Sequence, residues 1–169
     1  MSLAEWLIPE FDAEMAATRR VLERVPDGKT GWKPHPKSMT LGRLATLLAE
    51  LPGWAVNALT TDELDIMPPG GPPPKFEALG SAKQILELFD RNVKAARAAL
   101  AKTSDATFKQ PWAFKVGGRT VDTSPKYTVY RRTVINHLAH HRGQLTVYLR
   151  LNDAAVPAVY GPTADEPNF

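Results

Sequence analysis

The stretch NHLAHHRGQL, residues 136–145, lies near the end of a long segment with helical periodicity. His137 and His141 are four residues apart, so on a helix their side chains project from one face with neighbouring Cβ atoms. The same face carries three residues of the apolar stripe, Tyr130, Val134 and Tyr148. Both imidazoles are therefore predicted to point toward the side on which this helix is buried.

The segment that contains this stretch is predicted to be the last helix of the chain. Ser124 followed by Pro125 suits an N-cap and first helical position, and the pattern continues to about Leu151. Residues 152–169 are interrupted by prolines and are predicted to form an extended tail that can fold back over the helices.

Three earlier segments also place apolar residues at helical spacing. The first is predicted to run from a Ser2 cap to about Val25. The second begins after a Thr40 cap, and Pro52 within it predicts a kink or a local break near residues 50–53. The third begins after a Ser81 cap.

The connections between these helices are long and rich in proline and glycine. Residues 26–39 and 67–80 are predicted to be loops, and residues 62–66 a single helical turn. Residues 103–124 allow either a long loop or an irregular hairpin with short strands at 113–116 and 119–122. The sequence therefore predicts an all-α domain spanning residues 1–169, a four-helix bundle with long crossover loops and a possible short hairpin within 108–122.

The composition excludes several classes of function. Lysine and arginine number 21 against 18 acidic residues, and no dense basic run is present, so no nucleic-acid partner is expected. The absence of cysteine excludes disulfides, thiolate metal sites and a cysteine nucleophile. Neither a signal-peptide pattern nor a membrane-spanning run is visible, so a cytoplasmic protein without a membrane partner is expected.

The histidine pair, by which we mean His137 and His141, has two interpretations. Core histidines are often satisfied by a backbone carbonyl or a tyrosine, whereas imidazoles on the buried face of a bundle can also hold a metal. Two ligands are too few for a catalytic zinc-type site, which takes three protein ligands. The HExxH pattern of zinc proteases is absent because Leu138 follows His137, so a protease of that kind is excluded.

Three segments resemble the DinB-like (YfiT-type) superfamily of bacterial four-helix-bundle proteins. These are HPKSMTLGRLATLLAELPGW at 35–54, the histidine stretch with the following VYLRL, and VPAVYGPTADE at 156–166. The resemblance implies a homodimer that holds a divalent metal, zinc or nickel, through three histidines. It also implies transfer of a low-molecular-weight thiol such as bacillithiol, mycothiol or glutathione to a small electrophile, and in some members isomerisation or hydrolysis.

The family's ligand set matches this chain only in part. His137 and His141 correspond to the pair on the last helix, but Leu47 stands where relatives have the histidine of the second helix. Glu50, one turn further on, is the preferred substitute as third ligand. Gln144 and Tyr148 are the expected hydrogen-bond partners around the pair.

Other residues with a possible role in a site are given a structural interpretation first. Arg142 is predicted to pair with an acid on a neighbouring helix. His140 is predicted to face a neighbouring helix or solvent, and His35 to lie at the surface. Asp165 and Glu166 reach the pair only if the tail folds back. Three tryptophans are expected to be core or loop anchors, with the lining of a substrate mouth as the alternative: Trp32, Trp54 and Trp112.

Two functional hypotheses follow. The first is a metal-dependent transferase that acts with a low-molecular-weight thiol on a small electrophile, through His137, His141 and a ligand other than histidine. The second is a non-catalytic dimeric bundle that binds a small ligand and has lost its metal centre with the change at Leu47. The sequence leaves open whether the protein is an enzyme.

Overall fold

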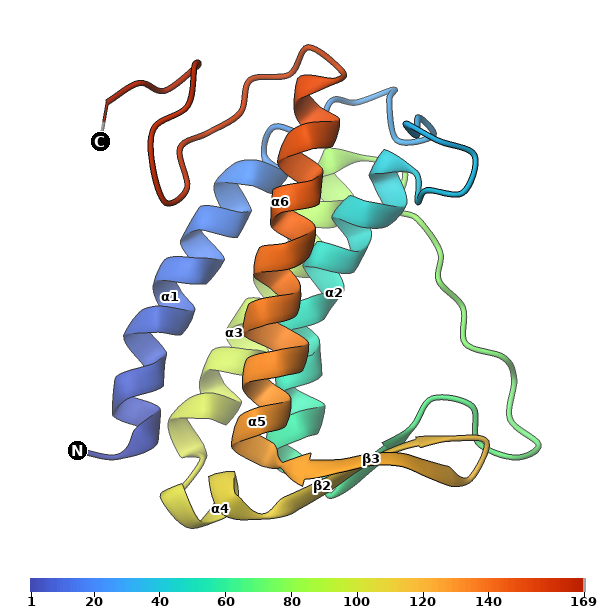
Figure 1. The fold of residues 1–169 in the computed structure, drawn as a ribbon, viewed down its shortest axis with the longest axis vertical. Helices are drawn as coiled ribbons and strands as arrows, with labels where there is room; N and C mark the ends of the chain where they lie inside the picture. The colour runs from blue at the N-terminus through green and yellow to red at the C-terminus, as the bar shows by residue number, and fades with distance from the viewer. Residues whose placement is uncertain (169) are drawn as a thin grey trace.

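The computed structural model describes residues 1–168 and is mostly helical, with a small sheet at one end (Figure 1). Four long helical segments run side by side: α1 (Leu3–Leu22), α2 (Leu41–Thr60), α3 (Ala82–Lys102) and a last segment of three parts. These parts are α5 (Lys126–Tyr130), the π-helix η1 (Arg131–Asn136) and α6 (His137–Arg150). The four predicted helices are confirmed as elements, and the possible short hairpin is present, but a purely all-α class is not confirmed because a small three-stranded sheet accompanies the helices.

Side-chain caps fix where three of the long helices begin. Ser2 and Glu5 form a capping box at α1, since each side chain bonds the other residue's backbone N–H. The hydroxyls of Thr40 and Ser81 accept hydrogen bonds from backbone N–H groups in the first turns of α2 and α3. The three predicted N-caps are therefore confirmed.

Pro52 does not break α2, which is a continuous helix from Leu41 to Thr60. Proline removes one backbone donor and leaves the carbonyls of the preceding turn short of partners. The side-chain amide of Asn92 on α3 donates to the Ala49 carbonyl, with an N–O distance of 2.8 Å. Of the predicted kink or local break, the break is wrong, because α2 is continuous past the proline; Asn92 adds an interhelical hydrogen bond three residues before it.

The sheet consists of β1 (Glu63–Asp65), β2 (Pro111–Val116) and β3 (Arg119–Pro125). β2 and β3 form the antiparallel hairpin that was one of the two alternatives, and β1 pairs parallel with β2. The Asp65 carboxylate accepts hydrogen bonds from the N–H groups of Gly117 and Gly118 in the hairpin turn. This side chain therefore ties β1 to a hairpin more than fifty residues away in sequence.

Three local predictions in this region are corrected. Residues 62–66 contain strand β1 instead of a helical turn, because they pair with the hairpin. Ser124 and Pro125 belong to β3, so the last helical segment begins at Lys126. A short helix, α4 (Asp105–Lys109), lies in a segment for which no helix was predicted.

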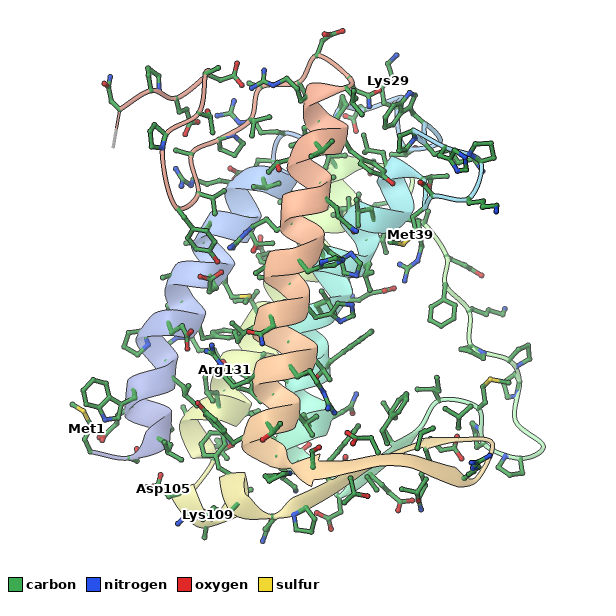
Figure 2. All side chains as sticks on the ribbon, in the orientation of Figure 1. Met1, Lys29, Met39, Asp105, Lys109 and Arg131 are labelled. Atoms are coloured by element: carbon green, nitrogen blue, oxygen red, sulfur yellow. The ribbon has the colours of Figure 1, made fainter. Side chains whose placement is uncertain are left out.

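The interior is filled by side chains from all four long segments (Figure 2). Arg131, labelled in Figure 2, extends from η1 toward α1 and forms an ion pair with Glu10. Within residues 1–168, none of the helices combines the length and the apolar character that crossing a membrane requires.

The π-helix changes which residues share a face with the histidine pair. Its hydrogen bonds close wider turns than those of an α-helix, so η1 rotates the preceding residues relative to α6. Tyr130 and Val134, predicted to share the face of the pair, lie in the helical core instead. Val129 and Thr133 share a cavity with His137 in their place.

Tyr130 is fully buried in the core, and burial raises the pKa of its hydroxyl above the ordinary value. Within the described part of the chain this hydroxyl has no hydrogen-bond partner. Its position therefore carries a cost that a phenylalanine would not have.

The tail folds back over α1 and α6, as predicted. Tyr160 donates to the Glu14 carboxylate of α1, with an O–O distance of 2.8 Å. Arg142, only 2% exposed, bonds the same carboxylate at 2.7 Å and the Tyr160 hydroxyl. The predicted pairing of Arg142 with an acid on another helix is confirmed.

Candidate functional site

The histidine pair is formed at the first two turns of α6. The Nε2 atoms of His137 and His141 are 2.9 Å apart, and their ring centroids are 4.6 Å apart. His141 is buried and His137 is half-buried. The spacing in sequence thus produces the predicted convergence of the two imidazoles.

Hydrogen-bond partners define how the pair shares its hydrogens when both rings are neutral. The Nδ1 atom of His141 lies 2.7 Å from the Gln144 carbonyl oxygen, which can only accept, so His141 carries its hydrogen on Nδ1. The two Nε2 atoms lie within hydrogen-bond distance of each other, so at most one of them carries the hydrogen between them. Gln144 is in contact with the pair, as predicted.

Both imidazoles favour the neutral form. Burial, reinforced by the neighbouring His141, lowers the pKa of His137 below its ordinary value. Burial also lowers the pKa of His141, and the hydrogen bond to Gln144 opposes this only in part. The positive charge of Arg43 adds to the lowering for His141, so this guanidinium lies within electrostatic reach of the ring.

The face of α2 opposite the pair is formed by residues at helical spacing: Arg43, Leu47, Glu50 and Trp54. At one end of this face the positive charge of Arg43 lowers the pKa of His141, and at the other end the ring of Trp54 lies 5.6 Å from that of His137. Leu47 lies between them and is 8% exposed. An apolar side chain thus occupies the place on α2 from which a third ligand would approach.

The residues present do not complete a three-ligand metal site. Both guanidinium NH groups of Arg43 donate to one oxygen of Glu50 at 3.0 Å, so this carboxylate is already engaged along its own helix. Among residues 1–168, no third histidine, cysteine, aspartate or glutamate joins the histidine pair in a group that could hold a metal ion. Glu50 as third ligand remains a prediction.

A cavity of about 560 Å³ opens beside the pair, and His137 forms part of its wall. We call it the side cavity. α2, the sheet, the connection between β1 and α3, and the start of the last helical segment contribute to its lining. Its lining residues include four large aromatic side chains: Trp54, Phe76, Trp112 and Phe114.

The hairpin and the 67–80 connection extend sideways from the helices and together enclose this region (Figure 1). Trp112 and Phe114 stack at a centroid distance of 6.4 Å with an angle of 14° between their planes. Phe76 is 63% exposed, and its ring lies 5.6 Å from the Arg43 guanidinium carbon. Aromatic residues far apart in sequence are thereby gathered around one space.

Trp54 and Trp112 line the side cavity, so the alternative interpretation of these residues as the lining of a substrate mouth has geometric support. Trp32 instead packs edge-to-face against Tyr148 at 5.5 Å. The Tyr148 hydroxyl donates to the Met39 carbonyl, so no hydrogen bond from it reaches the pair. Sequence reasoning did not identify Phe76 or Phe114, which have no periodic pattern to mark them.

The other candidates for the site lie elsewhere. His35 and His140 are exposed, as predicted, although the His140 ring lies 4.9 Å from that of His141. Asp165 pairs with Arg150 and also accepts from the Val156 N–H, so it serves the folded tail.

Comparisons with known proteins agree with this fold. The family model of the DinB superfamily matches residues 10–145. The uncharacterised protein YrdA of Bacillus subtilis (strain 168) is 27% identical over 161 residues, which cover 93% of this chain and 86% of that protein.

Two solved structures have the same overall arrangement. A DinB-like protein from Bacillus cereus ATCC 10987 superposes with a TM-score of 0.69 at 24% identity, over 92% of this chain and 97% of the other. The DinB-like protein YjoA from Bacillus subtilis gives a TM-score of 0.67 at 14% identity, over 91% and 96%. At these identities the two structures support the fold alone.

Proposed function

The chain belongs to the DinB superfamily, and we propose that it is a member that binds a small molecule in the side cavity without a three-ligand metal centre. The observation that carries this proposal is the aromatic-lined cavity of about 560 Å³ with an imidazole of the pair in its wall. Cavities of roughly 300–1,000 Å³ with apolar walls and a few polar groups are typical of small-molecule sites.

The composition of the α2 face supports binding over metal-assisted chemistry. A catalytic metal needs three protein ligands with one position open. Leu47 supplies no lone pair, and Arg43 holds Glu50 by two hydrogen bonds. A guanidinium close to the imidazoles also disfavours a second cation at the same place.

A second candidate is the metal-dependent transfer of a low-molecular-weight thiol to an electrophile. The specific observation in its favour is that two neutral imidazoles direct their Nε2 atoms at each other across 2.9 Å. Neutral imidazole is the form that binds metals, and His141 already has the outer hydrogen bond through Nδ1 that ligating histidines make. Homodimerisation also remains an expectation from the family resemblance.

The binding proposal is tested by filling the cavity. Ala58 is 2% exposed and lines the cavity, so Ala58→Phe places a ring inside it. Ala95 on α3 is exposed, and Ala95→Phe is the matched control. Two tryptophans line the cavity, so their fluorescence should report a saturable titration with uncharged two-ring aromatic probes.

Wild type and Ala95→Phe should bind such probes, and Ala58→Phe should not, with melting temperatures showing that every variant is folded. Binding that persists unchanged in folded Ala58→Phe would place the ligand outside the side cavity and contradict the proposal.

The second candidate is tested by elemental mass spectrometry on protein purified without an immobilised-metal column. Near-stoichiometric zinc or nickel that disappears in His137→Ala would favour the metal-dependent enzyme. Protein that remains folded and metal-free after incubation with zinc would support the binder.

A further inference from the structure

The side cavity is bordered by apolar side chains that remain in contact with water. Four of the lining residues are more than a third exposed: Trp54 (37%), Leu64 (36%), Ile66 (36%) and Phe76 (63%). Covering such surface lowers the free energy, and exposed apolar side chains that gather in one place mark a site of contact. The cavity is therefore open to solvent along this apolar rim.

One irregular segment contributes to the rim. We call it the strap: residues 70–80, with the sequence GGPPPKFEALG, which belong to the connection between β1 and α3 (Figure 1). Its residues Pro74 and Phe76 line the cavity. Within the described chain, residues 72–78 make no backbone-to-backbone hydrogen bond. The middle of the strap is therefore not held by regular structure.

Both ends of the strap are anchored. Just before it, Pro69 packs against the hairpin turn, 3.2 Å from the position that a Cβ on Gly118 would take. Near its other end, the Leu79 N–H donates to the Thr46 hydroxyl of α2, with an N–O distance of 2.9 Å. The strap is thus tied to the sheet on one side and to α2 on the other.

The composition of the strap lets its middle move as a unit between these anchors. Glycines stand at both ends, and Gly70 has a φ of +74°, a conformation that favours glycine. Three consecutive prolines restrict φ at residues 72–74 and keep this part stiff. A stiff stretch between pivots is the arrangement of a hinged loop.

Phe76 is the side chain of the strap that is placed to cover a ligand. Its ring lies 5.6 Å from the guanidinium carbon of Arg43, which is itself paired with Glu50. This cation–π contact keeps the ring beside α2 but leaves most of it in water. An apolar ligand in the cavity offers the ring a surface on which to pack.

We propose that the strap closes over a ligand in the side cavity and that Phe76 is the side chain that covers it. This inference rests on the proposed function and adds which part of the cavity wall moves. Closure buries exposed rim residues such as Ile66 and Phe76 against the ligand, so the ligand binds the closed form better than the open form and shifts the strap toward it.

A label on the strap reports its movement, because the chain has no cysteine of its own. Lys75 is exposed, so Lys75→Cys places a single thiol on the strap for reaction with monobromobimane. Bimane emission is quenched on contact with tryptophan, and Trp54 and Trp112 both line the cavity. The ligand is 2-methoxynaphthalene, an uncharged two-ring molecule that does not absorb where bimane is excited. We expect the emission to fall as the ligand saturates the protein.

Two controls separate closure from other effects of the ligand. The same label on Ala95→Cys, at an exposed position of α3, should keep its emission. Adding Ala58→Phe, which fills the cavity, to Lys75→Cys should abolish the loss of emission.

Calorimetric titration of unlabelled variants tests the role of Phe76. Phe76→Ser should weaken binding of 2-methoxynaphthalene roughly fivefold to 25-fold, the range for burying the exposed part of a phenylalanine side chain. Val121→Ser is the matched control, since Val121 is an exposed apolar residue of β3 outside the cavity lining. It should keep the wild-type dissociation constant.

The outcomes separate the inference from the proposed function. If the ligand binds in the cavity but emission from position 75 does not change, or if Phe76→Ser binds as tightly as wild type, the inference alone is wrong. Equal losses of emission at positions 75 and 95 would contradict it in the same way. If 2-methoxynaphthalene does not bind the wild-type protein, the proposed function fails and the inference fails with it.

Discussion

Replacing Leu47 by histidine should convert the histidine pair into a three-imidazole metal site. Leu47 lies on the face of α2 between Arg43 and Trp54. The charge of Arg43 lowers the pKa of His141, and the ring of Trp54 lies beside that of His137. A histidine at this position projects a third nitrogen toward the pair, and three protein ligands with one open position form a catalytic zinc-type site. The change therefore tests whether one residue on α2 is enough to complete a metal site with the pair.

The magnitude follows from two opposing contributions. Without metal, replacing a leucine that is 8% exposed by a polar ring should cost about 2–4 kcal/mol. For a domain of this size that lowers the melting temperature by roughly 4–16 °C. Zinc at about a hundred times its dissociation constant should restore about 2.7 kcal/mol, or roughly 5–11 °C.

The assay is thermal unfolding followed by circular dichroism, with and without zinc. Wild type, whose site has only the two imidazoles of the pair, should shift by less than about 2 °C, and Leu47→His by roughly 5–11 °C. Adding His137→Phe to Leu47→His should abolish the shift and serves as the control. A folded Leu47→His protein whose shift does not exceed that of wild type would refute the placement of Leu47 opposite the pair.

Three further predictions concern stability. Arg142→Met should cost about 3–5 kcal/mol in urea denaturation, because it removes the buried cation that pairs with the partly buried Glu14 carboxylate. Arg150→Met at a more exposed pair should cost under about 1 kcal/mol, and equal losses would contradict the prediction. Gly118→Ala should lower the free energy of unfolding by about 1–2 kcal/mol, because φ is +77° and Pro69 lies 3.2 Å from the added Cβ. Gly143→Ala, on open helix surface, should raise it by about 0.5–1 kcal/mol. Thermal melts of both variants give the two signs. The pKa values of His137 and His141 are lowered in the folded protein, so below about pH 6.5 the unfolded chain binds more protons than the folded one. The free energy of unfolding should therefore fall from pH 6.5 toward pH 5. In denaturation measured across this pH range, a variant with phenylalanine at both positions should show a flatter slope.

The helices were predictable because their signals are local. Caps at Ser2, Thr40 and Ser81 and apolar residues at helical spacing need only neighbours in sequence to act, and all three caps are present. The convergence of His137 and His141 was predictable for the same reason, since four residues make slightly more than one helical turn.

The elements that failed depend on distant partners. Residues 62–66 become a strand because β2 offers a parallel edge, and that edge is set by a hairpin about fifty residues away. Pro52 lies inside a continuous α2, and Asn92 of another helix donates to the Ala49 carbonyl three residues before it. Neither partner could be assigned from local pattern.

The predicted face of the last helix failed for a different reason. A regular helix places Tyr130 and Val134 on the face of His137, and the sequence contains no glycine or proline within η1 to announce a change. Tyr130 and Val134 lie in the core, and Val129 and Thr133 line the cavity with His137.

The sequence by itself determined the four long helices, the convergence of the histidine pair and the resemblance to the DinB family, because periodicity, capping and motif spacing act over one or two turns. Only the tertiary structure decided that His137 borders a cavity lined by aromatic side chains. Trp54, Phe76 and Trp112 come from three elements separated along the chain, and packing alone brings them together. Burial of apolar surface does not depend on sequence distance, so the site it creates cannot be read from any single stretch.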